Sequence, residues 1–134
     1  MIVEPHIVID RNRTITVPDQ LKRIAVQFDH NVETVTFDCP RYWDGHDMSV
    51  MEVYINYKRP DGKIRKYTAD NVTVDDSDNT IMHFDWTITN DVTSVNGNLE
   101  FVVCIKKTDE NGFDIAHWNS DINKEMYVSK GLEC

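Results

Sequence analysis

Short runs in which apolar and polar residues alternate follow one another along the chain. The clearest run spans residues 81–86, with Met82, Phe84 and Trp86 at its apolar positions and His83 and Asp85 at its polar positions. A period of two indicates a strand with one face toward a core and the other toward solvent. Residues 50–57 alternate in the same way and predict a second strand of this kind.

The run at residues 99–105 is apolar on both faces. One face carries Leu99, Phe101, Val103 and Ile105, and the other carries Val102 and Cys104. A strand that is apolar on both faces is usually covered on both. We therefore predict that this segment is the most buried strand, with the other strands paired to it or packed over it.

Turn-forming residues separate the alternating runs. The sequences around Pro60-Asp61-Gly62 and Asn111-Gly112 each predict a hairpin, because Gly accepts a positive φ. Residues 63–68 would form the partner strand of the first hairpin, and three cations there indicate an edge strand. A crossing with one helical turn is expected at residues 87–96. Further short strands are expected near residues 2–9, 14–17, 24–28, 34–38, 72–74, 113–118 and 126–128.

This pattern predicts an all-β fold. No window shows sustained helical periodicity, and no internal repeat is visible. Many short strands separated by turns are typical of an antiparallel, immunoglobulin-like β-sandwich of about eight to ten strands. A chain of 134 residues is long enough to bury the core of one such domain.

The formal net charge of −9 argues against two classes of partner. Contacts with phosphates need a cationic surface, so neither nucleic acid nor an anionic membrane is expected to bind. The first residues lack the basic region and apolar core of a secretory signal, and no run could span a bilayer, so we expect synthesis in the cytoplasm. Cys39, Cys104 and Cys134 are odd in number and far apart, which argues against a disulfide framework.

Few residues form a pattern that points to catalysis or metal binding. His83 and Asp85 share a strand face, and together with His46 and Asp47 they would form a metal or acid–base cluster. We favour the simpler interpretation of a solvated strand face, because no ligand spacing repeats elsewhere. The acidic residues at 75–79 lack the spacing of a calcium loop, so a polar hairpin loop is expected. The sequence therefore predicts no catalytic residue, no metal ligand and no cofactor.

Aromatic residues offer another candidate site. The group comprises Tyr42, Trp43, Tyr54, Tyr67 and Trp118. Rings of this kind can form a platform on which sugars stack. We favour the alternative, in which Trp43 closes one end of the sandwich and Trp118 packs beside a strand.

Four stretches together resemble a known family. They read Arg-Thr-Ile-Thr-Val-Pro at residues 13–18, Phe-Asp-Cys-Pro-Arg-Tyr-Trp-Asp-Gly at 37–45, His-Phe-Asp-Trp-Thr-Ile at 83–88 and His-Trp-Asn-Ser at 117–120. They resemble the N-terminal immunoglobulin-like domain of tail and baseplate proteins in phages and prophages of Firmicutes, with the upper baseplate protein family nearest. The motifs are structural, so the resemblance implies no active-site residues. It implies a domain that docks on the tail while later segments form oligomers or reach the host receptor.

We therefore expect a non-enzymatic structural component of the virion. It would be an anchoring domain of the tail or baseplate, assembled in the cytoplasm of the bacterial host. Its partners would be other tail or baseplate proteins, and residues 1–134 would form the N-terminal domain of a longer protein, which could be a homo-oligomer. The candidate contact residues from an expected irregular loop are Arg41, Tyr42, Trp43, Asp44 and Asp47. Tyr54 and Tyr67 are added as aromatic residues that we expect to be exposed.

Two other functions stay open at this point. A carbohydrate-binding module for host recognition would surround a sugar with Tyr42, Trp43 and one or two of Asp44, Asp47 and Asn119. A small hydrolase would use Asp and His side chains, namely His46, His83 and Asp85. The fold class alone does not separate these functions, because β-sandwiches host all three.

Overall fold

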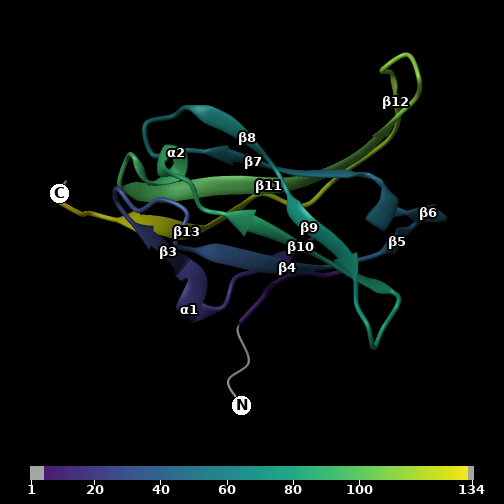
Figure 1. Ribbon diagram of the computed structural model, residues 1–134, viewed down its shortest axis with the longest axis horizontal. Coiled ribbons are helices and arrows are strands. Elements are labelled where there is room, and N and C mark those ends of the chain that lie inside the picture. Colours follow the sequence, from purple (N-terminus) through teal and green to yellow (C-terminus); the bar gives the residue numbers. More distant parts are fainter. Residues whose placement is uncertain (1–4, 133–134) are drawn as a thin grey trace.

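The computed structural model describes residues 5–132 and places two β-sheets face to face (Figure 1). The first sheet has five strands, in the order β2 (Ile15–Thr16), β1 (Ile7–Ile9), β4 (Thr34–Pro40), β10 (Ile81–Thr87) and β9 (Asp70–Val74). The second has six strands, of which five follow the order β3 (Arg23–Val26), β13 (Asn123–Ser129), β11 (Gly97–Thr108), β7 (Glu52–Lys58) and β8 (Ile64–Thr68). The sixth, β12 (Asp114–Asn119), pairs with β11. The all-β, sandwich-like fold expected from the alternation is confirmed.

Short elements connect the strands. They are the helices α1 (Asp19–Lys22) and α2 (Asn90–Thr93), the 3-10 helix η1 (Met48–Val50) and a two-stranded ribbon of β5 (Tyr42–Trp43) and β6 (His46–Asp47). Helix α2 is the single helical turn expected in the crossing at residues 87–96. Within residues 5–132, none of the helices has the length and apolar character needed to cross a membrane.

Aromatic rings from both sheets form the centre of the core. Phe37 of β4 stacks on Phe84 of β10, with their ring centroids 5.0 Å apart. Phe101 of β11 projects from the other sheet. Its ring centroid lies 6.1 Å from that of Phe37 and 5.7 Å from that of Trp86. The inward face predicted for residues 81–86 is correct, because Met82, Phe84 and Trp86 are all fully buried.

Strand β11 is the most extensively paired strand of the second sheet. It pairs with β7 along one side and with β13 and then β12 along the other. Leu99, Phe101, Val103 and Ile105 are buried on its inner face, and Cys104 is buried on its outer face. The prediction that other strands pair with this segment is confirmed, but its outer face is less covered than expected because Val102 is only half-buried.

Two pairings differ from the expected purely antiparallel sandwich. Strand β1 runs parallel to β4, and β3 runs parallel to β13. After β2, the chain crosses to the second sheet through α1 and β3, and it then returns to the first sheet as β4. That excursion brings β4 beside β1 in the same direction. The alternation of apolar residues shows which face of a strand is buried but not the direction in which the strand runs. The two parallel pairings could therefore not be predicted from it.

The segment around β3 also departs from the prediction. Residues 24–28 were expected to alternate, but Ile24 and Ala25 are both buried, whereas Val26 and Phe28 are partly exposed. A register shift between β3 and β13 at this point turns both Ile24 and Ala25 inward. The strand ends early because Phe28 has a φ of 77° and the Asp29 carboxylate accepts a hydrogen bond from the Val26 backbone N–H.

The hairpin and terminal predictions have mixed outcomes. The turns before Lys63 and Phe113 join β7 to β8 and β11 to β12, as expected, and β8 lies at a sheet edge. The first strand begins at Ile7 within the described part, and the predicted start at residue 2 lies outside it. Ile7 and Ile9 share the buried face that the alternation predicts. Cys134 also lies outside the described residues.

Candidate functional site

The stretch from Arg41 to Asp47 forms a locked hairpin, although its sequence predicted an irregular loop. Asp44 and Gly45 both have positive φ, of 48° and 82°, which suits a tight two-residue turn between β5 and β6. Arg41 donates two hydrogen bonds to Asp47, from Nε to Oδ1 at 3.1 Å and from Nη2 to Oδ2 at 3.0 Å. Asp47 Oδ1 also accepts bonds from the backbone N–H and the hydroxyl of Ser49.

We expect Asp47→Asn to lower the free energy of unfolding by about 1 kcal/mol at neutral pH. The hydrogen bonds from Arg41 and then Ser49 lower the pKa of Asp47 to about 2 in the folded protein. This depressed pKa adds stability above the unfolded value of 3.8, and the stability is lost as the pH falls through about 2. Urea unfolding at several pH values should show the variant and the parent converging in acid, and a gap that stays constant down to pH 2 would contradict this.

Trp43 and Trp118 meet at the end of the sandwich beside this hairpin. Their ring centroids lie 5.8 Å apart in an edge-to-face arrangement. The guanidinium carbon of Arg13 lies 4.7 Å from the Trp43 ring and 5.4 Å from the Trp118 ring, and Arg13 also donates a hydrogen bond to the Asn119 carbonyl. Trp118 is buried and Trp43 packs against the core, so both close the end of the sandwich, as we favoured.

A pocket of about 240 Å³ opens beside these two rings. Its lining includes Arg13, Trp43, Asp44, His46, His117 and Trp118. The indole N–H of Trp118 is buried and has no hydrogen-bond acceptor among the described residues. This small pocket therefore has aromatic walls and also polar groups, including the indole N–H of Trp118.

The two tyrosines that were expected to lie exposed do not form a joint contact surface. Tyr54 is only 7% exposed, which contradicts the prediction. The ammonium groups of Lys66 and Lys106, from the neighbouring strands, lie 4.2 Å and 5.4 Å from its ring centroid and cover it. Tyr67 pairs in register with the core residue Ile55, the neighbour of Tyr54, so the two tyrosines point to opposite faces of the sheet.

His83 and Asp85 lie on the outer face of the first sheet, as the alternation predicts, and each has partners there. Asp85 accepts hydrogen bonds from Thr36 and Asn71. Asp47 is paired with Arg41, and within residues 5–132 the group of potential metal ligands around His83 includes neither His46 nor Asp47, so the predicted four-residue cluster is not found. The favoured interpretation of a polar strand face is therefore correct in placement, but His83 belongs to a different cluster.

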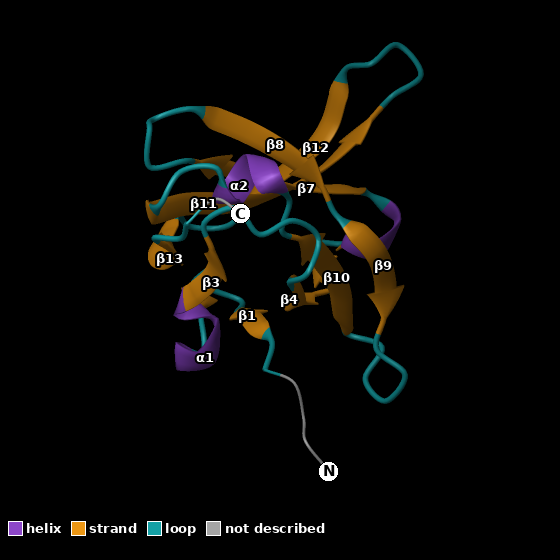
Figure 2. Ribbon diagram, turned by 60° about the vertical axis from the view of Figure 1, so that its left-hand side comes forward, coloured by secondary structure: helices purple, strands orange, loops and turns teal. Residues whose placement is uncertain are grey.

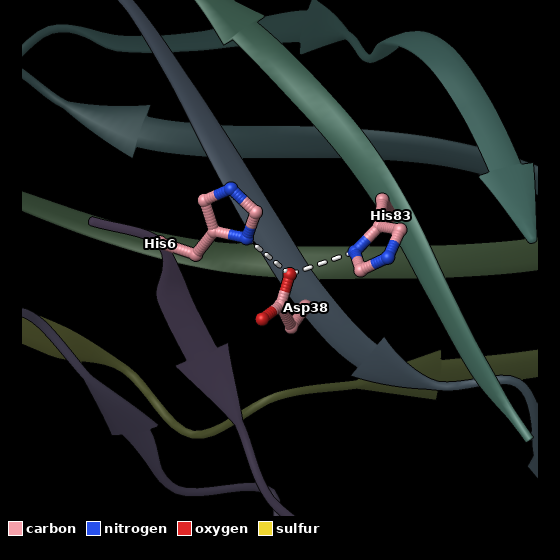
Figure 3. Close-up of side chains that lie close together, drawn as sticks. All are labelled: His6, Asp38 and His83. Atoms are coloured by element: carbon pink, nitrogen blue, oxygen red, sulfur yellow. Dashed lines mark hydrogen bonds and ion pairs between the residues drawn. The ribbon is translucent and has the colours of Figure 1, made fainter. Parts of the chain in front are cut away.

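That cluster consists of His6, Asp38 and His83, and we call it the His–Asp–His cluster (Figure 3). The Nδ1 atoms of His6 and His83 each lie 2.7 Å from the same oxygen, Asp38 Oδ1. Asp38 and His83 are direct partners across β4 and β10, and His6 directly precedes β1, the neighbour of β4. All three side chains are half-buried on the outer face of the sheet.

Asp75, which follows β9, extends this cluster to the next strand. Its Oδ1 lies 2.7 Å from His83 Nε2, and its Oδ2 accepts bonds from the Ser77 and Asp78 backbone N–H groups. Partial burial lowers the pKa of His83, but the bonds to Asp75 and Asp38 outweigh it and raise the pKa overall. The bond from His83 and those from the turn lower the pKa of Asp75. The acidic stretch at 75–79 is thus the expected hairpin loop, with its first carboxylate tied to a histidine.

His83 was considered as a metal ligand from the sequence, but its partners His6 and Asp38 were not predicted. His6 and Asp38 are 32 residues apart, and Asp38 and His83 are 45 apart. Only the register of β4 against β10 and of β1 against β4 brings them together. The one available signal was that His83 and Asp38 each occupy a polar position next to a Phe in an alternating run.

The hairpin of β11 and β12 extends away from the two sheets (Figure 2). The pairing of β11 with β7 ends at Lys106, whereas its pairing with β12 continues to Thr108. We call residues 107–115 the arm. Its two large apolar side chains, Phe113 and Ile115, are 71% and 57% exposed. Neither residue was among the candidate contacts named from the sequence.

No protein-family model matches the chain, and a search of curated proteins finds none that is similar to it in sequence. The features that bear on function are therefore the arm, the pocket and the His–Asp–His cluster, together with the resemblance of the four short stretches.

Proposed function

We propose that the chain is a non-enzymatic structural component of a phage tail or baseplate and acts through protein–protein contacts. The observation that carries the proposal is the arm, where Phe113 and Ile115 are exposed at a site away from the core. Exposed aromatic and aliphatic side chains that gather at one place mark contact sites, because they gain from burial in a partner. An acidic surface, with a net charge of −9, is compatible with protein partners.

The backbone of the arm offers a second means of contact. Among the described residues, β12 pairs only with β11, so its outer edge presents backbone N–H and C=O groups. Such an edge can accept a strand from a neighbouring protein. A tail or baseplate repeats each contact around its axis, and a projecting hairpin suits such repetition. The partners we propose are other tail or baseplate proteins, within the virion.

The resemblance to tail and baseplate domains is consistent with a structural role. Three of its four stretches supply Arg13, Trp43 and Trp118, which pack together at one end of the sandwich. Their role in this chain is therefore to close the fold. The fourth stretch supplies Phe84 and Trp86 to the core. Because the shared motifs hold the domain together, the contact surface can differ from one such protein to another.

Disruption of the gene tests this proposal. In the phage or prophage that encodes the chain, a stop codon early in the gene should yield filled heads without complete tails or baseplates in electron micrographs. A plasmid copy of the gene should restore them, because a structural component can be supplied from outside the phage genome. Normal, infectious particles without the chain would contradict a structural role in the virion.

One observation favours a carbohydrate-binding module as the alternative. The pocket beside Trp43 has aromatic walls, and the buried indole N–H of Trp118 could donate a hydrogen bond to a sugar hydroxyl. Against it, Arg13 already lies over the Trp43 ring, where a sugar would stack. A saturable change in tryptophan fluorescence with host wall polysaccharides would favour this alternative, and a flat titration would remove it.

A further inference from the structure

We propose that the His–Asp–His cluster binds one Zn²⁺ ion through His6 Nδ1, Asp38 and His83 Nδ1. The donor atoms of the three side chains all lie within 4.8 Å of one another. They come from one face of one sheet, and Figure 3 shows both imidazoles turned toward the same carboxylate oxygen. This metal site lies on the five-stranded sheet, whereas the arm belongs to the six-stranded one, so the inference is independent of the proposed contacts.

The spacing of the donors fits a zinc ion after a small adjustment. Zinc binds imidazole nitrogen and carboxylate oxygen at about 2.0–2.2 Å, so tetrahedral ligands lie about 3.3 Å apart. The two contacts between Asp38 Oδ1 and the imidazoles measure 2.7 Å, so each would open by about 0.6 Å. The two imidazole nitrogens, which lie within 4.8 Å of each other, would take up the same spacing of about 3.3 Å. Rotations of the half-exposed side chains would provide these movements.

Asp75 orients the His83 ring so that its Nδ1 atom can bind the metal. A histidine ligand of zinc usually donates its other ring N–H to a carboxylate, which fixes the ring and its tautomer. His83 Nε2 lies 2.7 Å from Asp75 Oδ1, and two turn N–H groups hold the other oxygen of Asp75 in place. Nδ1 of His83 is therefore directed toward Asp38 and His6.

The charges in the cluster also favour a dication. Asp38 and Asp75 contribute two negative charges, and hydrogen bonds at both nitrogens of His83 require it to carry one positive charge. When Zn²⁺ binds, His83 releases its Nδ1 proton to solvent and His6 shifts its proton to Nε2. The cluster then changes from a net charge of −1 to zero. The metal replaces a weaker proton-mediated link between the same side chains.

The chemical nature of the three ligands favours zinc over magnesium and calcium. Two imidazoles and one carboxylate suit zinc, whereas magnesium and calcium prefer oxygen ligands alone. Three protein ligands leave the fourth position of a tetrahedral zinc to water. The ion would connect β1, β4 and β10, and Asp75 would extend the link to β9. Binding to the folded state alone would stabilise the sheet by mass action.

The test is a zinc titration of the full chain, purified without a histidine tag and freed of metal with a chelator. Isothermal titration calorimetry with ZnCl₂ should give one site per chain, and MgCl₂ should give none. Zinc should also raise the midpoint of thermal unfolding. Binding of Co²⁺ in place of zinc should produce the visible absorption typical of tetrahedral coordination.

Variants distinguish the cluster from scattered surface histidines. His6→Gln and His83→Gln should each abolish the stoichiometric site, and Asp75→Asn should weaken it about 10–100-fold by releasing the His83 ring. His117→Gln is the matched control, because His117 also lies near a carboxylate, Asp114, but on β12, and it should bind zinc as the parent does. Circular dichroism confirms that each variant is folded. Zinc binding that is absent in the parent, or unchanged in His6→Gln and His83→Gln, would overturn the proposal.

Discussion

Replacing Phe101 with alanine is expected to lower the free energy of unfolding by about 3–5 kcal/mol, the range for removing a large buried aromatic side chain. Phe101 is 1% exposed and contacts Phe37 and Trp86 from the opposite sheet. Loss of the Phe101 ring leaves a cavity between the two sheets. The facing strands β4 and β10 cannot move in to close it, because each is paired with a neighbouring strand on both sides. The free energy of unfolding of a domain of this size is only about 5–15 kcal/mol, so the substitution removes a large part of it.

Chemical denaturation measures this effect. Urea unfolding followed by tryptophan fluorescence should show a much lower midpoint for Phe101→Ala. The matched control is Phe113→Ala, which removes the same side chain from a position that is 71% exposed and should change stability by less than about 0.5 kcal/mol. Equal losses from the two substitutions would contradict the placement of Phe101 at the centre of the core.

If the chain is a tail component, as we propose, the double substitution Phe113→Ser and Ile115→Ser should abolish its assembly into tails without changing its stability. The two side chains supply the exposed apolar surface of the arm, and truncating an interface anchor typically costs at least about 2 kcal/mol, or about 30-fold in affinity. In cells that produce the phage, sedimentation should leave the variant with free protein, whereas the parent chain moves with the particles.

A matched control keeps this result specific. Val32 is 71% exposed and lies in the loop before β4, so Val32→Ser removes apolar surface away from the arm. This variant should enter particles as the parent does. Incorporation of the double variant at the parent level would show that the arm is not the contact, and reduced incorporation of both variants would point to a general loss of solubility or folding.

Much of the fold could be predicted because alternation and turn chemistry are local. Residues 81–86 and 99–105 read as β10 and β11 from their apolar spacing alone. Gly62 and Gly112 mark the two hairpins because each adopts a positive φ that glycine tolerates best. The parallel pairings of β1 and β3 could not be read in this way, because strand direction depends on the path of the whole chain.

The candidate site was harder to predict because it depends on neighbours from distant strands. Tyr54 looks like an exposed aromatic until Lys66 and Lys106 are placed over its ring. Residues 41–47 were expected to form an irregular loop, so neither the β5–β6 hairpin nor the ion pair between Arg41 and Asp47 was foreseen. The His–Asp–His cluster forms only because β1 and β10 each pair with β4 in a particular register, which the sequence does not reveal.

The copy number of the chain in purified tails tests the proposed structural role. Tail particles from cells that encode the chain can be separated on a density gradient and analysed by quantitative mass spectrometry against a labelled standard. We expect the chain to be present in a fixed ratio to the other tail proteins, at a multiple set by the symmetry of the tail. A chain that stays in the soluble fraction, or varies in amount from one preparation to the next, would contradict it.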